Sequence, residues 1–585
     1  MKKLLFYLKE YKKESILGPL FKLLEASFEL IVPLVMAAII DTGVAAGDSG
    51  YIMRMCLVLV LLAVIGLVCS ITAQYFAAKA AVGTTTALRH ALFSHIESLS
   101  FSELDTVGVS TLITRMTSDI NQVQNGLNLS LRLLLRSPFI VFGAMIMAFT
   151  IDVRAALVFA VAIPLLSVVV FGVMLVSIPL YRRVQAALDA VLGITRENLT
   201  GSRVIRAFGK EQDEIQSFRE RNDALTGLQL YVGKISALMN PVTYVIINGA
   251  IVALVWTGAI RVDNGIITQG EVVALISYMS QILVELVKLA NLIININKSI
   301  ACANRVMDVM EIEPSITDDA GCGGSVGGSP DGSRTPAVEF SHVGLTYAGA
   351  GEEALSDISF VAAAGETIGI IGGTGSGKSS IVNLIPRFYE ATGGQVLVDG
   401  RCVKDYCLKE LRGRIGIVPQ KAVLFAGTIR ENLQWGNAQA SDQELMEALS
   451  VAQAREFVEE KEGGLDFHIE QGGRNLSGGQ RQRLTIARAI AKRPNILILD
   501  DSASALDFAT DAKLRSAIAG IAGQMTVFIV SQRAASVQHA DRILVMEDGK
   551  LVGQGTHEEL LDCCEVYREI YDSQFKRAAG EGDGQ

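Results

Sequence analysis

The sequence lacks any stretch in which Lys and Arg gather among aromatic residues. Aromatic residues make up only 6% of the 585 residues, and the formal net charge is −9, whereas a nucleic-acid-binding surface needs a basic stripe that follows the phosphates. Eight cysteines are present, but they form no C-x-x-C pair and no spacing typical of a zinc site or a disulfide scaffold. The sequence therefore argues against a nucleic-acid partner and against a cysteine-based metal centre.

What the chain does contain is long apolar runs. Hydrophobic residues make up 50% of it and the mean hydropathy is +0.37, more than a soluble protein usually carries. A helix needs about 20 apolar residues to cross the roughly 30 Å hydrocarbon layer, where no water satisfies the backbone. The sequence predicts an α-helical membrane domain with six spans, at approximately 16–40, 53–80, 132–151, 155–180, 238–260 and 270–294.

The distribution of basic residues predicts the orientation of the spans. Five lysines precede the first span, and the loop 41–52 has no Lys or Arg. By the positive-inside bias, and because the number of spans is even, both termini are expected in the cytoplasm. The basic start is followed by an apolar run too long for a cleaved signal peptide. We therefore expect a multi-pass protein of the cell membrane, and chain length and layout favour a bacterial plasma membrane.

The connections after the second and fourth spans are unusually long. Each runs for about 50 residues with helical periodicity and many charges, so the helices are expected to continue far beyond the membrane. Their tips lie near 104–124 and 197–218. Either tip could be a solvated loop, but an apolar face needs something to cover it. We therefore expect both tips to dock on a second domain.

Several charged residues fall inside predicted spans, among them Glu25 and Glu29 in the first and Glu285 and Lys288 in the sixth. Charged side chains facing lipid are costly. They could line a water-filled cavity, or Glu285 and Lys288 could pair at i,i+3 on one helix. The sequence leaves both interpretations open.

A Gly/Ser-rich segment, 318–336, has the composition of a flexible tether. It separates the apolar half of the chain from a half with mixed and charged sequence. We expect a membrane domain at 1–311, a linker at 312–336 and a nucleotide-binding domain at 337–585.

The second half contains a phosphate-binding motif. "IGIIGGTGSGKSS" (368–380) is a buried-strand run, then G-x-x-x-x-G-K-S, then a helical pattern. Backbone N–H groups of the loop surround phosphates, Lys378 reaches the β and γ oxygens, and the Ser379 hydroxyl holds Mg²⁺. "NILILDD" (495–501) supplies a partner strand whose Asp500 completes the shell of the metal. The predicted nucleotide-binding residues of the loop are Gly372, Gly373, Thr374, Gly375, Ser376, Gly377, Lys378, Ser379 and Ser380.

A second phosphate-binding helix start lies between these two motifs. In "NLSGGQRQRLTIARA" (475–489), Ser and two glycines precede a helix rich in Arg. One chain with two such ends and a single P-loop suggests that the second end serves a nucleotide held by another copy. The sequence therefore predicts a sandwich dimer.

The pentapeptide LSGGQ at 476–480, downstream of a P-loop and before Asp500, resembles the signature of ABC ATPases. The six spans and the two tips are similar to those of ABC exporter half-transporters, so the resemblance covers nearly the whole chain. It implies that the tips are coupling helices, that Tyr347 stacks on adenine and that Gln420 joins Ser379 and Asp500 at the metal. The signature residues Leu476, Ser477, Gly478, Gly479 and Gln480 would act on the ATP of a partner, and Ser504, Ala505, Leu506 and Asp507 would form the dimer-contact loop.

The chain departs from that family pattern at two catalytic positions. Hydrolytically competent members carry Glu after the metal-binding Asp, and His after the next strand, where this chain has Asp501 and Gln532. Removing one methylene retracts the carboxylate by about 1.5 Å, whereas a general base must lie within about 3 Å of the proton that it takes. Glutamine cannot carry positive charge or shuttle a proton. We expect this P-loop site to bind ATP and Mg²⁺ and to hydrolyse ATP poorly.

Because the signature is intact, the useful complement is a second half-transporter with Glu and His at the two positions. The sequence thus predicts one subunit of a heterodimeric ABC exporter that moves amphipathic drugs or lipids out of the cytoplasm. Two alternatives share every motif: an ATP-binding regulatory membrane subunit without net transport, and an importer built on exporter architecture.

Overall fold

The computed structural model describes residues 4–318, 336–502, 506–523 and 525–580. The chain divides into two compact units. The first unit contains residues 1–97 and 110–312, and the second contains residues 98–109 and 313–585. The larger part of the predicted linker, 312–336, falls within 319–335, outside the described residues.

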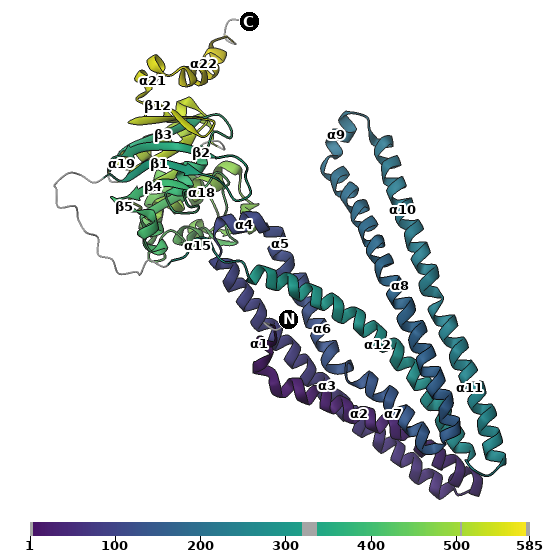
Figure 1. Cartoon of the computed structure of the whole chain (residues 1–585). Coiled ribbons are helices and arrows are strands. Elements are labelled where there is room, and N and C mark those ends of the chain that lie inside the picture. Colours follow the sequence, from purple (N-terminus) through teal and green to yellow (C-terminus); the bar gives the residue numbers. More distant parts are fainter. Residues whose placement is uncertain (1–3, 319–335, 503–505, 524, 581–585) are drawn as a thin grey trace. The chain divides into compact units, whose positions relative to one another are not determined.

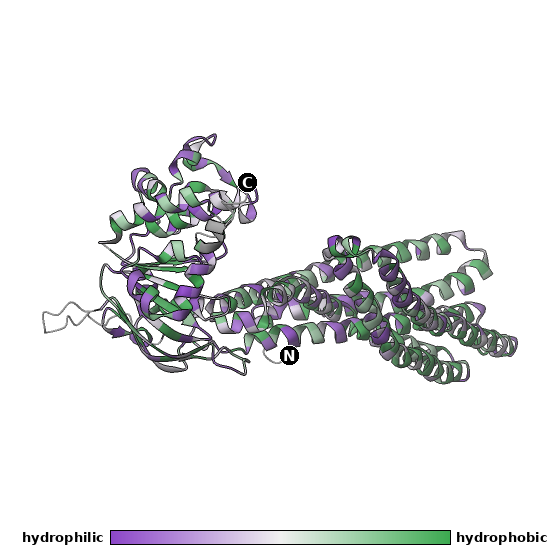
Figure 2. Cartoon of the chain, turned by 90° about the horizontal axis from the view of Figure 1, so that it is seen from above, coloured by the Kyte–Doolittle hydropathy of each residue, from purple (hydrophilic) through white to green (hydrophobic). Residues whose placement is uncertain are grey.

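The first unit is built of long helices, six of whose runs are long and apolar enough to cross a membrane (Figures 1 and 2). The predicted six-span membrane domain is thereby confirmed. The helices are α1 (Leu4–Leu8), α2 (Lys12–Ala38), α3 (Ser49–Ser98), α5 (Val109–Thr114), α6 (Ile120–Leu133), α7 (Arg136–Ile151), α8 (Val153–Thr200), α9 (Ser202–Ala207), α10 (Glu211–Ala237), α11 (Met239–Asp263) and α12 (Gln269–Met310).

Small residues let these helices approach one another closely. The bundle core joins α2, α7, α8, α11 and α12, and many of its fully buried positions are alanines, among them Ala26, Ala144 and Ala274. Transmembrane helices associate through such close packing because lipid offers no hydrophobic driving force between them. The far ends of α8 and α10 run as a hairpin closed by α9 (Figure 1).

The charged residues of the spans are paired. Arg136 donates to Glu285 at 2.8 Å and to Glu29 at 2.6 Å, and Lys288 lies 2.9 Å from the same Glu285 carboxylate. Glu25 pairs with Lys22 at 2.6 Å. The structure therefore favours pairing for Glu25, Glu29, Glu285 and Lys288. The i,i+3 pair of Glu285 and Lys288, one of the two interpretations of the sequence, forms along α12, and Arg136 of α7 extends the pairing to Glu29 of α2.

The second unit contains two larger sheets. A six-stranded sheet has the order β12-β11-β3-β10-β9-β6, with β12 antiparallel at its edge, and a four-stranded antiparallel sheet has the order β2-β1-β4-β5. The strands are β1 (Val338–Leu345), β2 (Leu355–Ala362), β3 (Thr367–Gly372), β4 (Gly393–Val398), β5 (Arg401–Cys402), β6 (Ile415–Val418), β9 (Ile496–Asp500), β10 (Thr526–Ser531), β11 (Arg542–Glu547) and β12 (Lys550–Gly555), besides a short pair, β7 (Gly427–Thr428) and β8 (His468–Ile469).

Continuous apolar sequence explains the central strands. Every residue of β9, "ILILD", is buried, as expected for a parallel strand covered on both faces. The helices of this unit are α4 (Phe101–Val107), α13 (Lys378–Leu384), α14 (Leu408–Arg414), α15 (Ile429–Gln434), α16 (Asp442–Val451), α17 (Arg455–Glu459), α18 (Gly478–Ala491), α19 (Phe508–Ala522), α20 (Ala534–Val537), α21 (His557–Cys563) and α22 (Glu565–Gly580).

One helix of this unit, α4, comes from the connection that follows the second predicted span. Ser100 begins it with a capping box, in which its own N–H donates to Glu103 at 2.9 Å. The Phe101 ring packs on Phe388, with 4.6 Å between the ring centres, and Tyr389 donates a hydrogen bond of 2.5 Å to Asp105. The part of the first predicted tip that contacts the second domain is therefore 101–107, which begins earlier than the predicted range 104–124.

Candidate nucleotide site

The carboxyl ends of three neighbouring strands meet at one edge of the six-stranded sheet. Val530 of β10 is in register with Asp500 of β9, and Ser531 with Ile371 of β3. Ligands of open α/β sheets bind at this edge. A cavity of about 280 Å³ lies there, lined by Tyr347, Ala354, Thr374, Gly375, Gly377, Lys378, Ser379, Ser380, Gln420, Asp500, Asp501, Val530, Ser531 and Gln532.

Two glycines of the loop between β3 and α13 stand where a side chain would not fit. A Cβ on Gly372 would lie 2.1 Å from the Met546 carbonyl oxygen of β11. Gly377 has a φ of +93°, a conformation that L side chains rarely adopt. The loop can therefore pass close to the neighbouring strand and turn its N–H groups toward a phosphate.

Lys378 lies along the loop that it follows. Its ammonium donates to the carbonyl oxygen of Gly372 at 2.9 Å and also to that of Gly373. Burial lowers the pKa of Lys378, and the nearby Asp501 and Asp500 carboxylates oppose that change. A buried cation held between main-chain carbonyls is an electrostatic partner for phosphate oxygens.

Ser379 and Asp500 form the oxygen pair expected for a metal. The Ser379 hydroxyl donates to Asp500 at 2.9 Å. Burial raises the pKa of Asp500, while the Ser379 hydrogen bond lowers it and the adjacent Asp501 raises it further. A hydroxyl and one carboxylate, with phosphate oxygens completing the shell, suit Mg²⁺, which prefers oxygen ligands and keeps several waters. These side chains therefore fit the metal implied by the fold.

Asp501 is fixed by its main chain. Its N–H donates to the Val530 carbonyl at 2.9 Å, which ties it to β10. Gln420 places its amide nitrogen 3.5 Å from the Asp501 carboxylate. Because the hydrogen bond to Val530 holds the backbone, a backbone shift cannot bring the shorter carboxylate of Asp501 to the position that a glutamate carboxylate would reach.

Gln532 lines the same cavity, just beyond β10. Its carbonyl oxygen accepts a hydrogen bond from Gln574 at 2.8 Å, which anchors the main chain at this position. His539 lies farther along, with a ring nitrogen 3.2 Å from Gln538, and is not among the lining residues. Within the described residues, the amide of Gln532 thus occupies the position expected of an imidazole.

Tyr347 connects the cavity to α4. Its hydroxyl lies 2.8 Å from the Ser380 hydroxyl, and its ring meets Tyr389 edge-on with 5.0 Å between the ring centres. Tyr389 in turn binds Asp105 of α4. One aromatic residue therefore separates the side chain expected to contact adenine from the helix expected to couple this domain to the membrane.

The signature residues lie away from this cavity. Ser477 is the N-cap of α18 and closes a capping box with Gln480, whose N–H donates to the Ser477 hydroxyl at 3.2 Å. Ser477 and Gly478 are exposed, and Leu476 is buried. Of the predicted dimer-contact loop, Ser504 and Ala505 lie outside the described residues, Leu506 is buried and Asp507 caps α19.

Sequence reasoning did not identify three residues that the structure brings into functional positions. Arg136, at the start of the third span, is the centre of the buried charge cluster. Phe388 and Tyr389 form the receiving surface for α4. An arginine inside a predicted span could have suggested the cluster, because an unpaired charge there is costly. No feature of the sequence marks Phe388 and Tyr389 as contacts of α4.

Comparison with known families gives two matches. The family described as ABC transporter transmembrane region matches residues 15–286, and the family described as ABC transporter matches residues 355–504. The first covers most of the helical unit and also residues 98–109 of the second unit. The second contains the P-loop, the signature, Asp500 at the end of β9 and Asp501.

Individual proteins match over nearly the full chain. An uncharacterized ABC transporter ATP-binding protein of Mycobacterium tuberculosis is 37% identical, over 99% of each chain. An ATP-dependent lipid A-core flippase of Hahella chejuensis is 32% identical, over 86% of this chain and 85% of its own length. A solved structure of a bacterial Atm1-family ABC exporter with ATP bound shares the fold, with a TM-score of 0.77 over 96% of this chain and 98% of that one, at 22% identity.

Proposed function

Because the chain belongs to the ABC transporter family, as an ATP-driven transporter of the exporter type, we propose that it is the slow-hydrolysing half of an asymmetric pair. In this proposal it holds ATP and Mg²⁺ at its own P-loop, and its signature completes the active site of a different half-transporter. The observation that carries the proposal is Asp501, whose backbone is tied to Val530 and whose carboxylate is one methylene shorter than that of glutamate.

This chain also has two exposed surfaces that a partner chain would cover. Ser477 and Gly478 present a helix start to solvent instead of to the cavity at Lys378. On the hairpin of α8 and α10, the apolar side chains of Leu199, Val204 and Phe208 are between 60% and 75% exposed. Apolar surface of this kind marks an interaction site. We propose that both surfaces are covered by the partner.

The site residues have the following roles in this proposal. Lys378 and the loop 372–377 bind the phosphates, Tyr347 contacts the base, and Ser379, Asp500 and Gln420 hold Mg²⁺. The membrane domain is 1–311, the linker 312–336 and the ATPase domain 337–585, with both termini in the cytoplasm of a bacterium. The similarity to a lipid A-core flippase supports an amphipathic substrate, lipid or drug.

A matched pair of substitutions in the assembled complex tests whether the two nucleotide sites contribute unequally to ATP turnover. The complex is isolated from native membranes through a tag on this chain, and the companion chain is identified by mass spectrometry. Lys378→Ala should weaken ATP binding here yet retain more than about half of the ATP turnover of the complex. Ser477→Arg should lower turnover by about a hundredfold or more, because it blocks the active site of the partner.

A second N-cap provides the control. Ser441 begins α16 with the same capping box, and the Glu444 N–H donates to its hydroxyl at 3.4 Å. Ser441→Arg removes an N-cap of the same kind, which usually costs about 1 kcal/mol of stability. It should leave ATP turnover unchanged. If Lys378→Ala and Ser477→Arg lower turnover equally, the two sites are equivalent and the proposal is wrong. A complex that turns over ATP without moving lipid in vesicles would instead indicate a regulatory subunit.

A further inference from the structure

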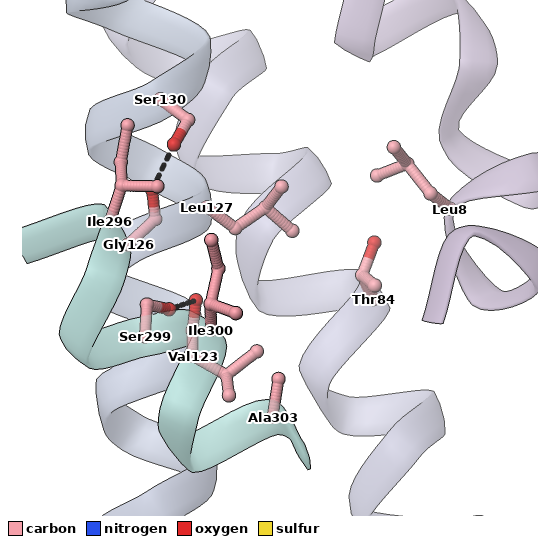
Figure 3. Close-up of a pocket in the computed structure, with 10 residues that line it drawn as sticks. All are labelled: Leu8, Thr84, Val123, Gly126, Leu127, Ser130, Ile296, Ser299, Ile300 and Ala303. Carbon is pink, nitrogen blue, oxygen red and sulfur yellow. Dashed lines mark hydrogen bonds between the residues drawn. The ribbon is translucent and has the colours of Figure 1, made fainter. Parts of the chain in front are cut away.

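A small apolar cavity lies in the helical unit, away from the nucleotide site. It has a volume of about 120 Å³ and is enclosed by α1, α3, α6 and α12 (Figure 3). Engineered apolar cavities of about 150 Å³ bind benzene, so this one has space for a segment of hydrocarbon of about six carbon atoms. Its lining is Leu8, Thr84, Val123, Gly126, Leu127, Ser130, Ile296, Ser299, Ile300 and Ala303.

Three hydroxyl groups line the cavity, and two of them are bound to the protein. Ser130 donates to the Gly126 carbonyl at 2.7 Å, and Ser299 to the Gln122 carbonyl at 3.0 Å. Among the residues that the structure describes, none is a hydrogen-bond partner of the Thr84 hydroxyl, although Thr84 is only 1% exposed. Figure 3 shows it between Leu8 and the side chains of α12. Buried hydroxyls usually have a partner, and this one belongs to a residue that lines the cavity. A ligand with a polar atom beside its hydrocarbon would supply that partner.

The end of the cavity near Thr84 lies next to a basic segment. Leu8 ends α1, and the residues that follow include Lys9, Lys12 and Lys13, all of them exposed. The Lys9 ammonium lies 5.4 Å from the centre of the Phe6 ring, which is itself 64% exposed. Exposed apolar side chains next to lysines are typical of segments that lie in the interface of an anionic membrane.

We propose that this cavity binds one acyl chain of an anionic phospholipid from the surrounding membrane. The lysines pair with the phosphate, the Thr84 hydroxyl donates to the ester carbonyl, and the first carbons of the chain fill the space between Leu127 and Ile300. The three lysines are assigned to the phosphate because they closely follow Leu8, which lines the cavity. No described residue lines both the cavity and the nucleotide site.

Binding of dihexanoyl phosphatidylglycerol to the full chain in detergent micelles tests the site, because its six-carbon chains fit the volume. Ala303→Leu fills the cavity, and Thr84→Val removes the hydroxyl at nearly constant shape. Each variant should weaken binding by about tenfold or more. Ala259→Leu, at an exposed position of α11, makes the Ala303 change outside the cavity and should alter the affinity by less than about twofold.

Two further ligands separate the headgroup from the chain. Glycerol phosphate carries the charge without a chain and should not compete. Dihexanoyl phosphatidylcholine carries the chain with a zwitterionic headgroup and should bind more weakly. The triple variant Lys9→Gln, Lys12→Gln and Lys13→Gln should abolish this preference for the anionic lipid.

Equal lipid affinity in the wild type, Ala303→Leu and Thr84→Val would overturn the proposal, as would effective competition by glycerol phosphate. If Ala303→Leu does not fold, Thr84→Val decides alone. None of these measurements requires hydrolysis, so their failure is distinguishable from failure of the asymmetric pair.

Discussion

Asp500 and Asp501 are adjacent and chemically identical, but their surroundings give them different tasks. Asp500 is 7% exposed at the end of β9 and accepts the Ser379 hydroxyl. Asp501 is half-buried on the wall of the cavity, with the Gln420 amide as its neighbour. Burial and a hydroxyl partner suit Asp500 to hold a cation. In the proposed function, Asp501 stands where attack by water would need a carboxylate with a longer reach.

The surroundings of Asp500 predict a pH dependence for metal-assisted nucleotide binding. Burial raises its pKa, so acidification protonates it at a higher pH than an ordinary aspartic acid, whose pKa is about 3.9. Protonation removes a Mg²⁺ ligand, and the Mg²⁺-dependent part of ATP binding should fall first as the pH is lowered. Since the folded state holds this proton more tightly than the unfolded state, the same protonation stabilises the fold.

Titration of ATP binding against pH, with and without Mg²⁺, measures the effect. Asp500→Asn should show no Mg²⁺-dependent part at any pH. A wild-type difference between the two curves that stays constant down to about pH 4 would show that Asp500 does not hold the metal.

At the scale of elements, buried charge joins helices of the membrane unit. Arg136 of α7 contacts Glu29 of α2 and Glu285 of α12, and Ser137 donates to the second oxygen of Glu285 at 2.8 Å. Taking such charges out of water is expensive, and the pairing offsets that cost only while every partner is present. The cluster therefore fixes which faces of α2, α7 and α12 meet.

Removing the arginine should destabilise the bundle strongly. Arg136→Gln leaves Glu285 buried with less compensation, and the expected loss is about 3 kcal/mol of unfolding free energy. Denaturant unfolding in detergent micelles measures it. The exposed pair of Lys210 and Asp213 at the start of α10 is the control, and Lys210→Gln should leave the unfolding midpoint unchanged. Equal unfolding midpoints for Arg136→Gln and Lys210→Gln would show that the cluster does not stabilise the bundle.

A hydrogen bond between Tyr389 and Asp105 contributes to holding α4, beside the aromatic contacts of Phe101. Tyr389→Phe keeps the ring against Phe101 and Tyr347 but removes the bond to Asp105. The loss of this hydrogen bond should lower the local stability of α4 by about 1 kcal/mol. The hydrogen-exchange rate of the α4 amides should then rise about fivefold, while ATP binding is retained. Tyr406→Phe, which removes a buried bond to the Val398 carbonyl in the same unit, should leave α4 exchange unchanged. Equal exchange in wild type and Tyr389→Phe would show that α4 is held by its aromatic contacts alone.

The sequence allowed some of these elements to be predicted, and for physical reasons. Six apolar runs identify the spans because lipid permits few alternatives, and the strand–loop–helix pattern at 368–380 identifies the P-loop because phosphate binding requires it. The partners of Arg136 and the docking of Phe101 on Phe388 could not be predicted, since they join residues more than 100 positions apart. The predicted tip, 104–124, begins later than α4, although the capping box of Ser100 and Glu103 is a local signal that is visible in the sequence.

At the scale of the whole molecule, each of the two units has an exposed surface that bears on assembly. The helical unit exposes apolar side chains at the end of its α8–α10 hairpin, and the second unit exposes the start of α18 at Ser477. Both are surfaces that a second half-transporter would cover, and a nucleotide at Lys378 would need the signature of that second chain. In the proposed pair, the difference between Asp501 and a glutamate would decide whether the two nucleotides are hydrolysed at equal rates.

The central claim is tested most directly by the ATP turnover of this chain purified without any companion and reconstituted in nanodiscs. General-base catalysis contributes about 10² to 10⁴ in rate. We therefore predict that the wild-type chain is nearly silent, and that Asp501→Glu combined with Gln532→His raises its turnover at least tenfold. Brisk turnover by the wild-type chain, unchanged in the double variant, would contradict the account.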